Sequence, residues 1–453
     1  MVFPTSRSPG RAARWCVLVP CLLVVAGPAL GAGIFPYPAH VEKLDNGLQA
    51  IVIPMQSGGL VAYWSIVRTG ARDEYEPGHT GFAHFFEHMM FRGSEKYPRE
   101  AREKIVTAMG ADTNAFTSDD LTAYYFNIAA EDLEKVVDLE SDRFKNLQYP
   151  EEEFKTESGA VYGEYRKNRS SPFFTLYEAI HQAAYDVHTY GHTAMGVVED
   201  IQAMPTMYEY SRSFFQRYYR PENVVILVTG DVKVPETMAL LKKYYGDWKP
   251  GYVAPQVPAE PEQSREKRLD VPYEGQSLPI AWVAYKVDAF DPKNTNLVAA
   301  QLLSALAFGE TSAIHKKLVL DEQVLEFIEA EVNMNRDPGL LDIIARIKDP
   351  AKVDYVLGEI DATIAQYRDT APDAQRLADL KSRLKYEFLM GLDTPMNVAR
   401  ALVRVIAVSG GIDAVETLYD AYGRVSAADV QAAAQKYLVP TRRTVAVLRG
   451  GQS

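Results

Sequence analysis

Apolar positions along the chain follow two periods, one typical of strands and one typical of helices. Short runs rich in Val, Ile, Thr, Tyr and Phe predict strands, and an Asn46-Gly47 turn joins the first pair. Longer runs with apolar residues three and four positions apart predict helices. The predicted strands occupy residues 41–54, 59–70, 113–129 and 220–230, and the predicted helices residues 78–98, 131–146 and 150–168. This mixture predicts an α+β fold.

The two halves of the chain resemble each other in pattern. Residues 213–231 form a helix, a break at Tyr-Arg-Pro and an apolar strand closed by glycine, and residues 432–451 repeat this order. A charged, proline-rich segment at residues 249–268 predicts an exposed linker between them. We therefore expect two homologous domains, at residues 33–248 and 269–453, each with an antiparallel-rich sheet layered with helices. Chance similarity between generic α+β segments is the alternative.

The predicted helix at residues 78–98 places polar groups in an apolar setting. Its apolar residues are Phe82, Phe85, Phe86, Met89, Met90 and Phe91. Among them lie His84, Glu87 and His88, in the pattern H-x-x-E-H. Residues four apart share a helix face, so the two imidazoles can bind one ion with Glu87 beside it. Two packed core histidines with a salt-linked glutamate are the alternative.

The predicted helix at residues 150–168 offers a further ligand. Phe154, Glu157, Val161 and Glu164 fall on one stripe of this helix. A zinc site needs a third protein ligand and an open position for water. The stripe is either a solvated edge or the face that meets the first helix and completes the site.

Composition limits what such a site can use. The only cysteines are Cys16 and Cys21, and both lie in an N-terminal segment that we expect to be removed. Any metal site must therefore be built from His, Asp and Glu. The net charge of −12 argues against a general nucleic-acid binder. After the N-terminal segment, no apolar run has the length of a membrane span.

Residues 1–32 are typical of a secretory signal peptide. Arg7, Arg11 and Arg14 precede an apolar run at residues 15–27, and the small residues Ala29 and Gly31 suit cleavage. We therefore expect export, to a bacterial periplasm or out of the cell. A mitochondrial transit peptide is the alternative, because the first 14 residues include arginines and no acids. The continuous apolar run argues against it.

Several segments, taken in chain order, resemble the pitrilysin family of zinc peptidases, the inverzincins. They are "HFFEHMMFRGSEKYP", "GADTNAFTSDDLTAYYF", "EYRKNRSSP", "HTYGHTAMGVVEDI" and "YYRPENVVILVTGDV". This family includes insulin-degrading enzyme and mitochondrial processing peptidase, whose beta subunit this two-domain chain is similar to. The resemblance extends over residues 41–450. It implies a zinc endopeptidase acting on peptides or unfolded segments, and a chain that forms half of a clamshell chamber.

The resemblance also implies roles for the residues of the two helices. His84, His88 and Glu164 would bind one zinc ion per chain, and Glu87 would be the general base. Glu157 would orient a ligand histidine from outside the coordination sphere.

Other matching positions concern the substrate. Asn114 and Ala115 match the family's edge strand, to which an extended peptide adds as a further strand. His188 and His192 also lie four apart, but their surroundings predict a loop. The family does not use them as ligands, so we interpret them as structural.

One part of the family pattern is missing. Active members contribute an arginine and a tyrosine from the second type of domain, close to the metal. In the corresponding stretch, residues 315–332, Val319 stands at the arginine position and Leu325, Glu326 and Phe327 occupy the tyrosine region. We therefore expect a heterodimer with a homologous subunit that supplies the pair, since a homodimer would repeat the gap. A non-catalytic scaffold or chaperone-like subunit, and a mitochondrial presequence-processing subunit, are the alternatives.

Overall fold

The structure is a computed structural model that describes residues 33–450 of the 453 in the chain. The predicted signal peptide therefore lies outside the described residues. Residues 34–450 form one compact unit.

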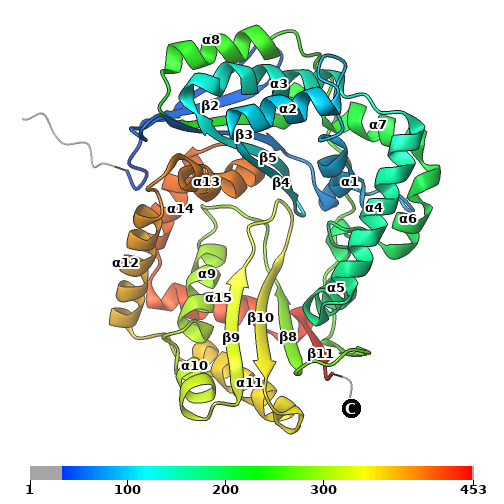
Figure 1. The fold of residues 1–453 in the computed structure, drawn as a ribbon. Coiled ribbons are helices and arrows are strands. Elements are labelled where there is room, and N and C mark those ends of the chain that lie inside the picture. Colours follow the sequence, from blue (N-terminus) through cyan, green and yellow to red (C-terminus); the bar gives the residue numbers. More distant parts are fainter. Residues whose placement is uncertain (1–32, 451–453) are drawn as a thin grey trace, which may run out of the picture. The chain divides into compact units, whose positions relative to one another are not determined.

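The first half of the chain builds a six-stranded sheet with helices packed on it (Figure 1). The strand order is β1-β2-β6-β3-β5-β4, with β2 and β6 parallel and all other neighbours antiparallel. The strands are β1 His40–Lys43, β2 Gln49–Pro54, β3 Leu60–Val67, β4 Asp112–Thr117, β5 Thr122–Ala129 and β6 Val224–Gly230. The helices are α1 Phe82–Met89, α2 Arg99–Met109, α3 Leu133–Asn146, α4 Glu151–Arg169, α5 Pro172–Ala184, α6 Val198–Ala203, α7 Tyr208–Tyr218 and α8 Val234–Tyr245.

The second half builds a five-stranded sheet in the order β7-β11-β8-β10-β9. Its strands are β7 Lys267–Val271, β8 Ile280–Lys286, β9 Leu325–Val332, β10 Leu340–Ile347 and β11 Arg443–Leu448. Its helices are α9 Thr295–Phe308, α10 Ala313–His315, α11 Val353–Asp369, α12 Ala374–Met390, α13 Pro395–Ser409, α14 Asp413–Arg424 and α15 Ala427–Tyr437, and a π-helical turn spans Lys316–Asp321.

The five strands of the second sheet match β2, β6, β3, β5 and β4 of the first in order, and β1 has no counterpart. Only the pair β7 and β11 is parallel in the second sheet, as β2 and β6 are in the first, and the remaining strands follow in the same directions. This confirms the predicted α+β fold of two similar layered domains. The chain between α8 and β7 has no regular structure, although β7 begins at Lys267, inside the predicted linker. The domain boundaries themselves stay a prediction.

One helix from each half packs against the sheet of the other half (Figure 1). Helix α13 packs Leu402 and Ile406 against one face of the first sheet, in a cluster with Trp64. Helix α5 packs Leu176 and Ile180 against the second sheet, in a cluster with strands β8 and β11. Alternate side chains of each central strand are thus buried on opposite faces of the sheet, which explains their continuous apolar sequences.

The helix that carries the H-x-x-E-H pattern is shorter than predicted. We predicted one helix over residues 78–98, but α1 ends at Met89 and α2 begins at Arg99. Between them Gly93 has a φ of +126°, which favours glycine, and a Cβ there would lie 2.7 Å from the backbone nitrogen of Arg99. The chain therefore turns at this glycine instead of continuing the helix.

One helical stretch in the described part of the chain, Thr295–Asp321, is long and apolar enough to cross a membrane. However, 67% of its most apolar window is buried inside the protein. Helix α9, which forms most of it, packs against β9 and α15. Its composition is thus that of a core helix.

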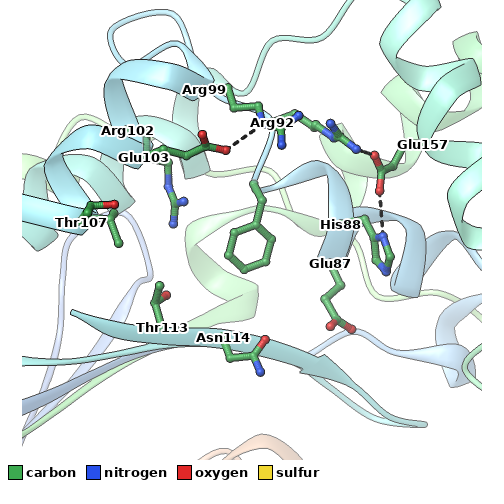
Figure 2. Close-up of a pocket in the computed structure, with 12 residues that line it drawn as sticks. Glu87, His88, Arg92, Arg99, Arg102, Glu103, Thr107, Thr113, Asn114 and Glu157 are labelled. Carbon is green, nitrogen blue, oxygen red and sulfur yellow. Dashed lines mark hydrogen bonds and ion pairs between the residues drawn. The ribbon is translucent and has the colours of Figure 1, made fainter. Parts of the chain in front are cut away.

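Strand β4 lies at the edge of the first sheet and pairs with β5 alone within the described chain. It passes beneath α1 and α2, so that Thr113, Asn114 and Glu87 lie around one space (Figure 2). An exposed edge strand beside the H-x-x-E-H helix leaves backbone groups available to an added strand.

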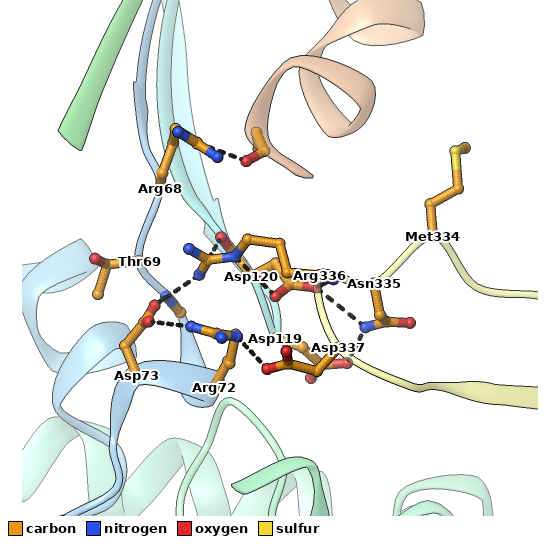
Figure 3. A network of polar contacts seen from close by, with 12 residues as sticks. Arg68, Thr69, Arg72, Asp73, Asp119, Asp120, Met334, Asn335, Arg336 and Asp337 are labelled. Atoms are coloured by element: carbon orange, nitrogen blue, oxygen red, sulfur yellow. Dashed lines mark hydrogen bonds and ion pairs between the residues drawn. The ribbon is translucent and has the colours of Figure 1, made fainter. Parts of the chain in front are cut away.

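A buried network of charges joins the second half to the first (Figure 3). Arg336, in the turn between β9 and β10, donates to Asp73 over 2.8 Å and to Asp120 over 3.1 Å. Arg72 reaches back from the first half to Asp337 over 2.6 Å. Asp73 and Asp120 are almost fully buried, so their charges depend on these arginines.

Replacing Arg336 should therefore destabilise the fold. In Arg336→Met, Asp73 and Asp120 lose a buried cation, and we expect the free energy of unfolding to fall by about 3–5 kcal/mol. Urea denaturation at neutral pH measures it. The matched control is Arg383→Met, because Arg383 forms an exposed pair with Glu387 at 3.8 Å. That variant should lose less than about 0.5 kcal/mol; equal losses would contradict the role of the network.

Candidate metal centre

Helix α1 presents its polar residues from an aromatic core. Phe82, Phe85 and Phe86 are fully buried and pack against aromatic residues of α4 and α7. This packing fixes how the helix is rotated. His84 and His88 then project on one side, with ring centroids 4.7 Å apart.

Helix α4 brings a carboxylate to the two imidazoles. Glu164 Oε2 lies 3.3 Å from Nε2 of His88 and 3.8 Å from Nε2 of His84. The ligand atoms of these three residues all lie within 4.8 Å of one another. Two imidazole nitrogens and a carboxylate oxygen at this spacing fit the donor set of a zinc site with one open position. This is the only such group of His, Cys, Asp and Glu among residues 33–450.

Glu157, the other carboxylate on this face of α4, contacts the ring nitrogen of His88 that does not face Glu164. Nδ1 of His88 donates to Oε1 of Glu157 over 2.8 Å, which leaves Nε2 facing Glu164. Glu157 is only 4% exposed, and Arg92 pairs with its second oxygen (Figure 2). A carboxylate in this place fixes the imidazole ring and raises its basicity as a ligand. The predicted stripe of α4 thus faces α1 and is not a solvated edge.

Burial sets the protonation of the first histidine. His84 is 7% exposed, and burial together with the nearby His88 lowers its pKa to about 3. Its imidazole is therefore neutral at neutral pH, the form that binds metals. Its Nδ1 has no hydrogen-bond partner among the described residues.

Glu87 lies between α1 and strand β4. The hydroxyl of Thr117 on β4 donates to Oε2 of Glu87 over 2.6 Å. Burial raises the pKa of Glu87 above its ordinary value, although Thr117 and His88 oppose the shift. A carboxylate with a raised pKa and a free oxygen is suited to accept and return a proton.

Two cavities meet at Glu87. One, of about 460 Å³, extends past His88 along β4, and Asn114 lines it. The other, of about 470 Å³, extends past His84 and Glu164 toward the second half. Asn114 is exposed, whereas Ala115 is buried, so the two predicted substrate residues differ in what they can offer.

The segment that lacks the arginine and tyrosine lies in the second half. Val319 belongs to the π-helical turn and packs against the apolar core of the second half. Phe327 on β9 stacks on Phe173 with ring centroids 6.0 Å apart. An arginine and a tyrosine do line the cavity on the His84 side. They are Tyr177 of α5 and Arg404 of α13, which come from elements outside the predicted segment.

His188 and His192 lie away from this cluster. Nε2 of His188 lies 3.0 Å from Asp337, beside the network that joins the halves. His192 Nδ1 lies 3.8 Å from Glu74. Both therefore contact carboxylates of the scaffold rather than the metal candidates.

Sequence reasoning missed three residues that build the site. Arg92 lies four positions after His88, and Thr117 lies two after Ala115 on the same strand, so both positions were readable from spacing. Glu74 had no such signal. It accepts the backbone N–H groups of Gly81 and Ala83, over 2.8 and 2.6 Å, and so fixes the start of α1.

Two family descriptions match consecutive parts of the chain. The description "Insulinase (Peptidase family M16)" matches residues 55–197, and "Peptidase M16 inactive domain" matches residues 207–384. The zinc protease PqqE of Helicobacter pylori is 28% identical over 437 residues, which are 94% of this chain and 96% of that protein. A crystal structure of a protease from Helicobacter pylori superposes with a TM-score of 0.86 at 26% identity, over 91% of this chain and 99% of that one.

A mitochondrial relative matches over a shorter range. Mitochondrial-processing peptidase subunit beta of Bos taurus is 27% identical over 254 residues, which are 55% of this chain and 50% of that protein. The two family descriptions together extend from residue 55 to residue 384, and every member of the metal cluster falls within the first. The chain therefore belongs to peptidase family M16, the insulinase family, as its resemblance to pitrilysin-type peptidases predicted.

Proposed function

We propose that the chain is a zinc-dependent endopeptidase that hydrolyses peptides or unfolded segments. The observation that carries this proposal is the convergence of His84, His88 and Glu164, with Glu87 beside them. Membership of a peptidase family and similarity to a protein named zinc protease support the same reaction.

The residues present fit one zinc ion. His84 and His88 would bind it through Nε2 and Glu164 through a carboxylate oxygen, with Glu157 holding the His88 ring. When bound, zinc polarises the scissile carbonyl and increases the acidity of a water molecule.

Glu87 moves the proton in this scheme. It takes a proton from the attacking water as the new C–O bond forms, and it delivers the proton to the amine as the C–N bond breaks. Thr117 donates to one oxygen of Glu87, and the other oxygen takes the proton. The substrate backbone adds to the free edge of β4, where Asn114 and Ala115 lie.

The expected partner follows from Val319 at the arginine position and from residues 325–327 in the tyrosine region. Residues 325–327 are Leu, Glu and Phe, so none of the four side chains replaces the arginine or the tyrosine hydroxyl as a donor to the oxyanion. We propose that a homologous subunit supplies the arginine and tyrosine, that the two chains close a clamshell chamber, and that the complex acts in the periplasm or outside the cell. The bovine relative is named as the beta subunit of a processing peptidase, which fits assembly of this kind.

Glu87→Gln should separate metal binding from turnover. The ligands remain while the base is gone, so zinc content should persist and peptide hydrolysis should fall about a thousandfold or more. Zinc by atomic emission and cleavage of a quenched peptide library measure both. His84→Ala and Glu164→Gln are the contrast, because they should lose zinc. Full activity of Glu87→Gln would refute the mechanism, and a wild-type chain that binds zinc but cleaves nothing with any partner would favour the scaffold alternative.

Glu157→Gln tests the support of His88. The amide cannot accept the His88 proton as strongly, so zinc affinity or activity should weaken by roughly 10- to 100-fold. Competition with a chelator of known affinity measures the loss. Glu153→Gln is the matched control, since Glu153 lies one turn earlier on α4 and is exposed. If both variants keep wild-type affinity, Glu157 has no role in the site.

The isolated chain should be a poor enzyme even when it carries zinc. Missing oxyanion donors typically cost about 3–4 kcal/mol of transition-state stabilisation, a rate loss on the order of several hundredfold. The test is to assay the purified, zinc-loaded chain before and after adding a candidate homologous subunit. Full activity of the isolated chain would contradict the heterodimer proposal. Arg404 and Tyr177, which line the cavity beside Glu87, would then be the candidates for the oxyanion donors.

A further inference from the structure

The cavity along β4 contains a cation that the metal chemistry does not use. This cavity is bounded by Glu87 and His88 at one end and by residues of α2 and β4 at the other. Phe91 also lines it, and the residues of α2 and β4 include Arg102, Val106, Thr107 and Thr113. Figure 2 shows Arg102 reaching from α2 into the space above Thr113.

Arg102 is buried without a partner. Its side chain belongs to a residue that is 5% exposed, and its Nε and Nη2 atoms make no hydrogen bond within the described part of the chain. Its guanidinium lies 5.2 Å from the centre of the Phe91 ring and 5.7 Å from that of Phe126. Aromatic faces attract a cation, but they do not replace a counter-charge.

The surrounding charges leave one positive charge unbalanced. Arg143 also lies over the Phe91 ring, at 5.4 Å, and it is paired with Glu140 over 2.6 Å. The two guanidinium groups around this ring thus share one buried carboxylate. Burial and the proximity of Arg143 lower the pKa of Arg102 to about 10, so it still carries its proton at neutral pH.

The other arginines of the cavity are already paired. Arg92 pairs with Glu157, and Arg99 pairs with Glu103 over 2.8 Å (Figure 2). Among the arginines of this cavity in the described part of the chain, Arg102 is the one that forms no ion pair; Glu140 and Glu103 lie close enough to act on its charge, but each pairs with another arginine. Burying an unpaired charge is costly, and such a charge persists where a ligand completes it.

The position of the cavity on the His88 side determines which part of a bound peptide can reach it. Both cavities border Glu87, one on the His88 side and one on the His84 side. A peptide that crosses the metal cluster along β4 would place the residues on either side of the scissile bond in different cavities. The cavity on the His84 side is lined by Asp119, Glu331 and Asp342 with Arg404, so it disfavours an added carboxylate.

We propose that Arg102 binds a carboxylate of the substrate residue that flanks the scissile bond on the His88 side. This inference rests on the proposed peptidase function and adds its substrate class, peptides with an acidic group at that position. The carboxylate can come from an Asp or Glu side chain or from the C-terminus of a short peptide. Either forms a charge-assisted pair with a guanidinium inside a partly dry cavity.

The test compares matched peptides in the zinc-loaded chain with its partner subunit. Quenched peptides carry Glu or Gln at each position in turn, and a further set ends in a free acid or an amide just beyond the scissile bond. We expect kcat/KM to be about tenfold or more higher for Glu than for Gln at one flanking position. A preference for the free acid alone would assign the site to the peptide C-terminus instead.

Variants of Arg102 separate recognition from folding. Arg102→Met should bring the Glu to Gln ratio to about one while cleavage of the Gln peptide persists, and Arg102→Lys should keep part of the preference. Lys104→Met is the matched control, because Lys104 is exposed on the same helix. The melting temperature of Arg102→Met should equal or exceed that of wild type, since an unpaired buried charge is removed. A fall in melting temperature with an unchanged ratio would overturn the proposal.

Failure of the peptidase itself is distinguishable from failure of this inference. If no peptide is cleaved, the proposed function fails, and binding still tests Arg102. Fluorescence anisotropy with labelled Glu and Gln peptides on Glu87→Gln gives the ratio of Kd values without turnover. A ratio of about one for both this variant and its Arg102→Met derivative would overturn the proposal, whereas a ratio that depends on Arg102 supports it.

Discussion

The burial of helix α1 is the constraint on which the metal centre depends. Phe85 and Phe86 anchor the helix in an aromatic core, and this orientation places His84 and His88 on the side facing α4. Polar groups at such a depth are tolerated only when they are neutral or paired. His84 meets this condition by losing its proton, and Glu157 meets it through His88 and Arg92. Neutralisation and pairing thus reduce the cost of burying these groups.

The second half shows what the same position becomes without a site. Helix α9 packs against the edge strand β9 as α1 packs against β4, and it follows β8 as α1 follows β3. It carries no histidine, and its residues from Leu297 to Phe308 are mostly buried Leu, Ala and Val. Because α9 has no buried histidine to support, the second half needs no counterpart of Glu157 or Arg92. The asymmetry between the halves therefore lies in side chains, while the backbone order is shared.

How much could be predicted from sequence depended on the range of the interaction. The pairing of His84 with His88, and the stripe of Glu157 and Glu164, follow from helical periodicity within one segment. That the two stripes meet came from resemblance to a family, since no local pattern encodes contact between helices. The turn at Gly93 was missed because the apolar run continues beyond Met89, and the backbone conformation there decides against it. The unpartnered state of Arg102 was unreadable, because it depends on which carboxylates other elements bring near.

The exchange of helices between the halves has a consequence for the newly made chain. The face of the first sheet that contains Trp64 is covered by α13, which begins only at Pro395. Nearly the whole chain must leave the ribosome before that face can be buried, so folding of the first half waits for the second. Contacts of such long sequence separation form slowly and leave apolar strands open to aggregation in the meantime. A sheet face that stays open until the last segments arrive gives chaperones a long interval in which to bind the chain.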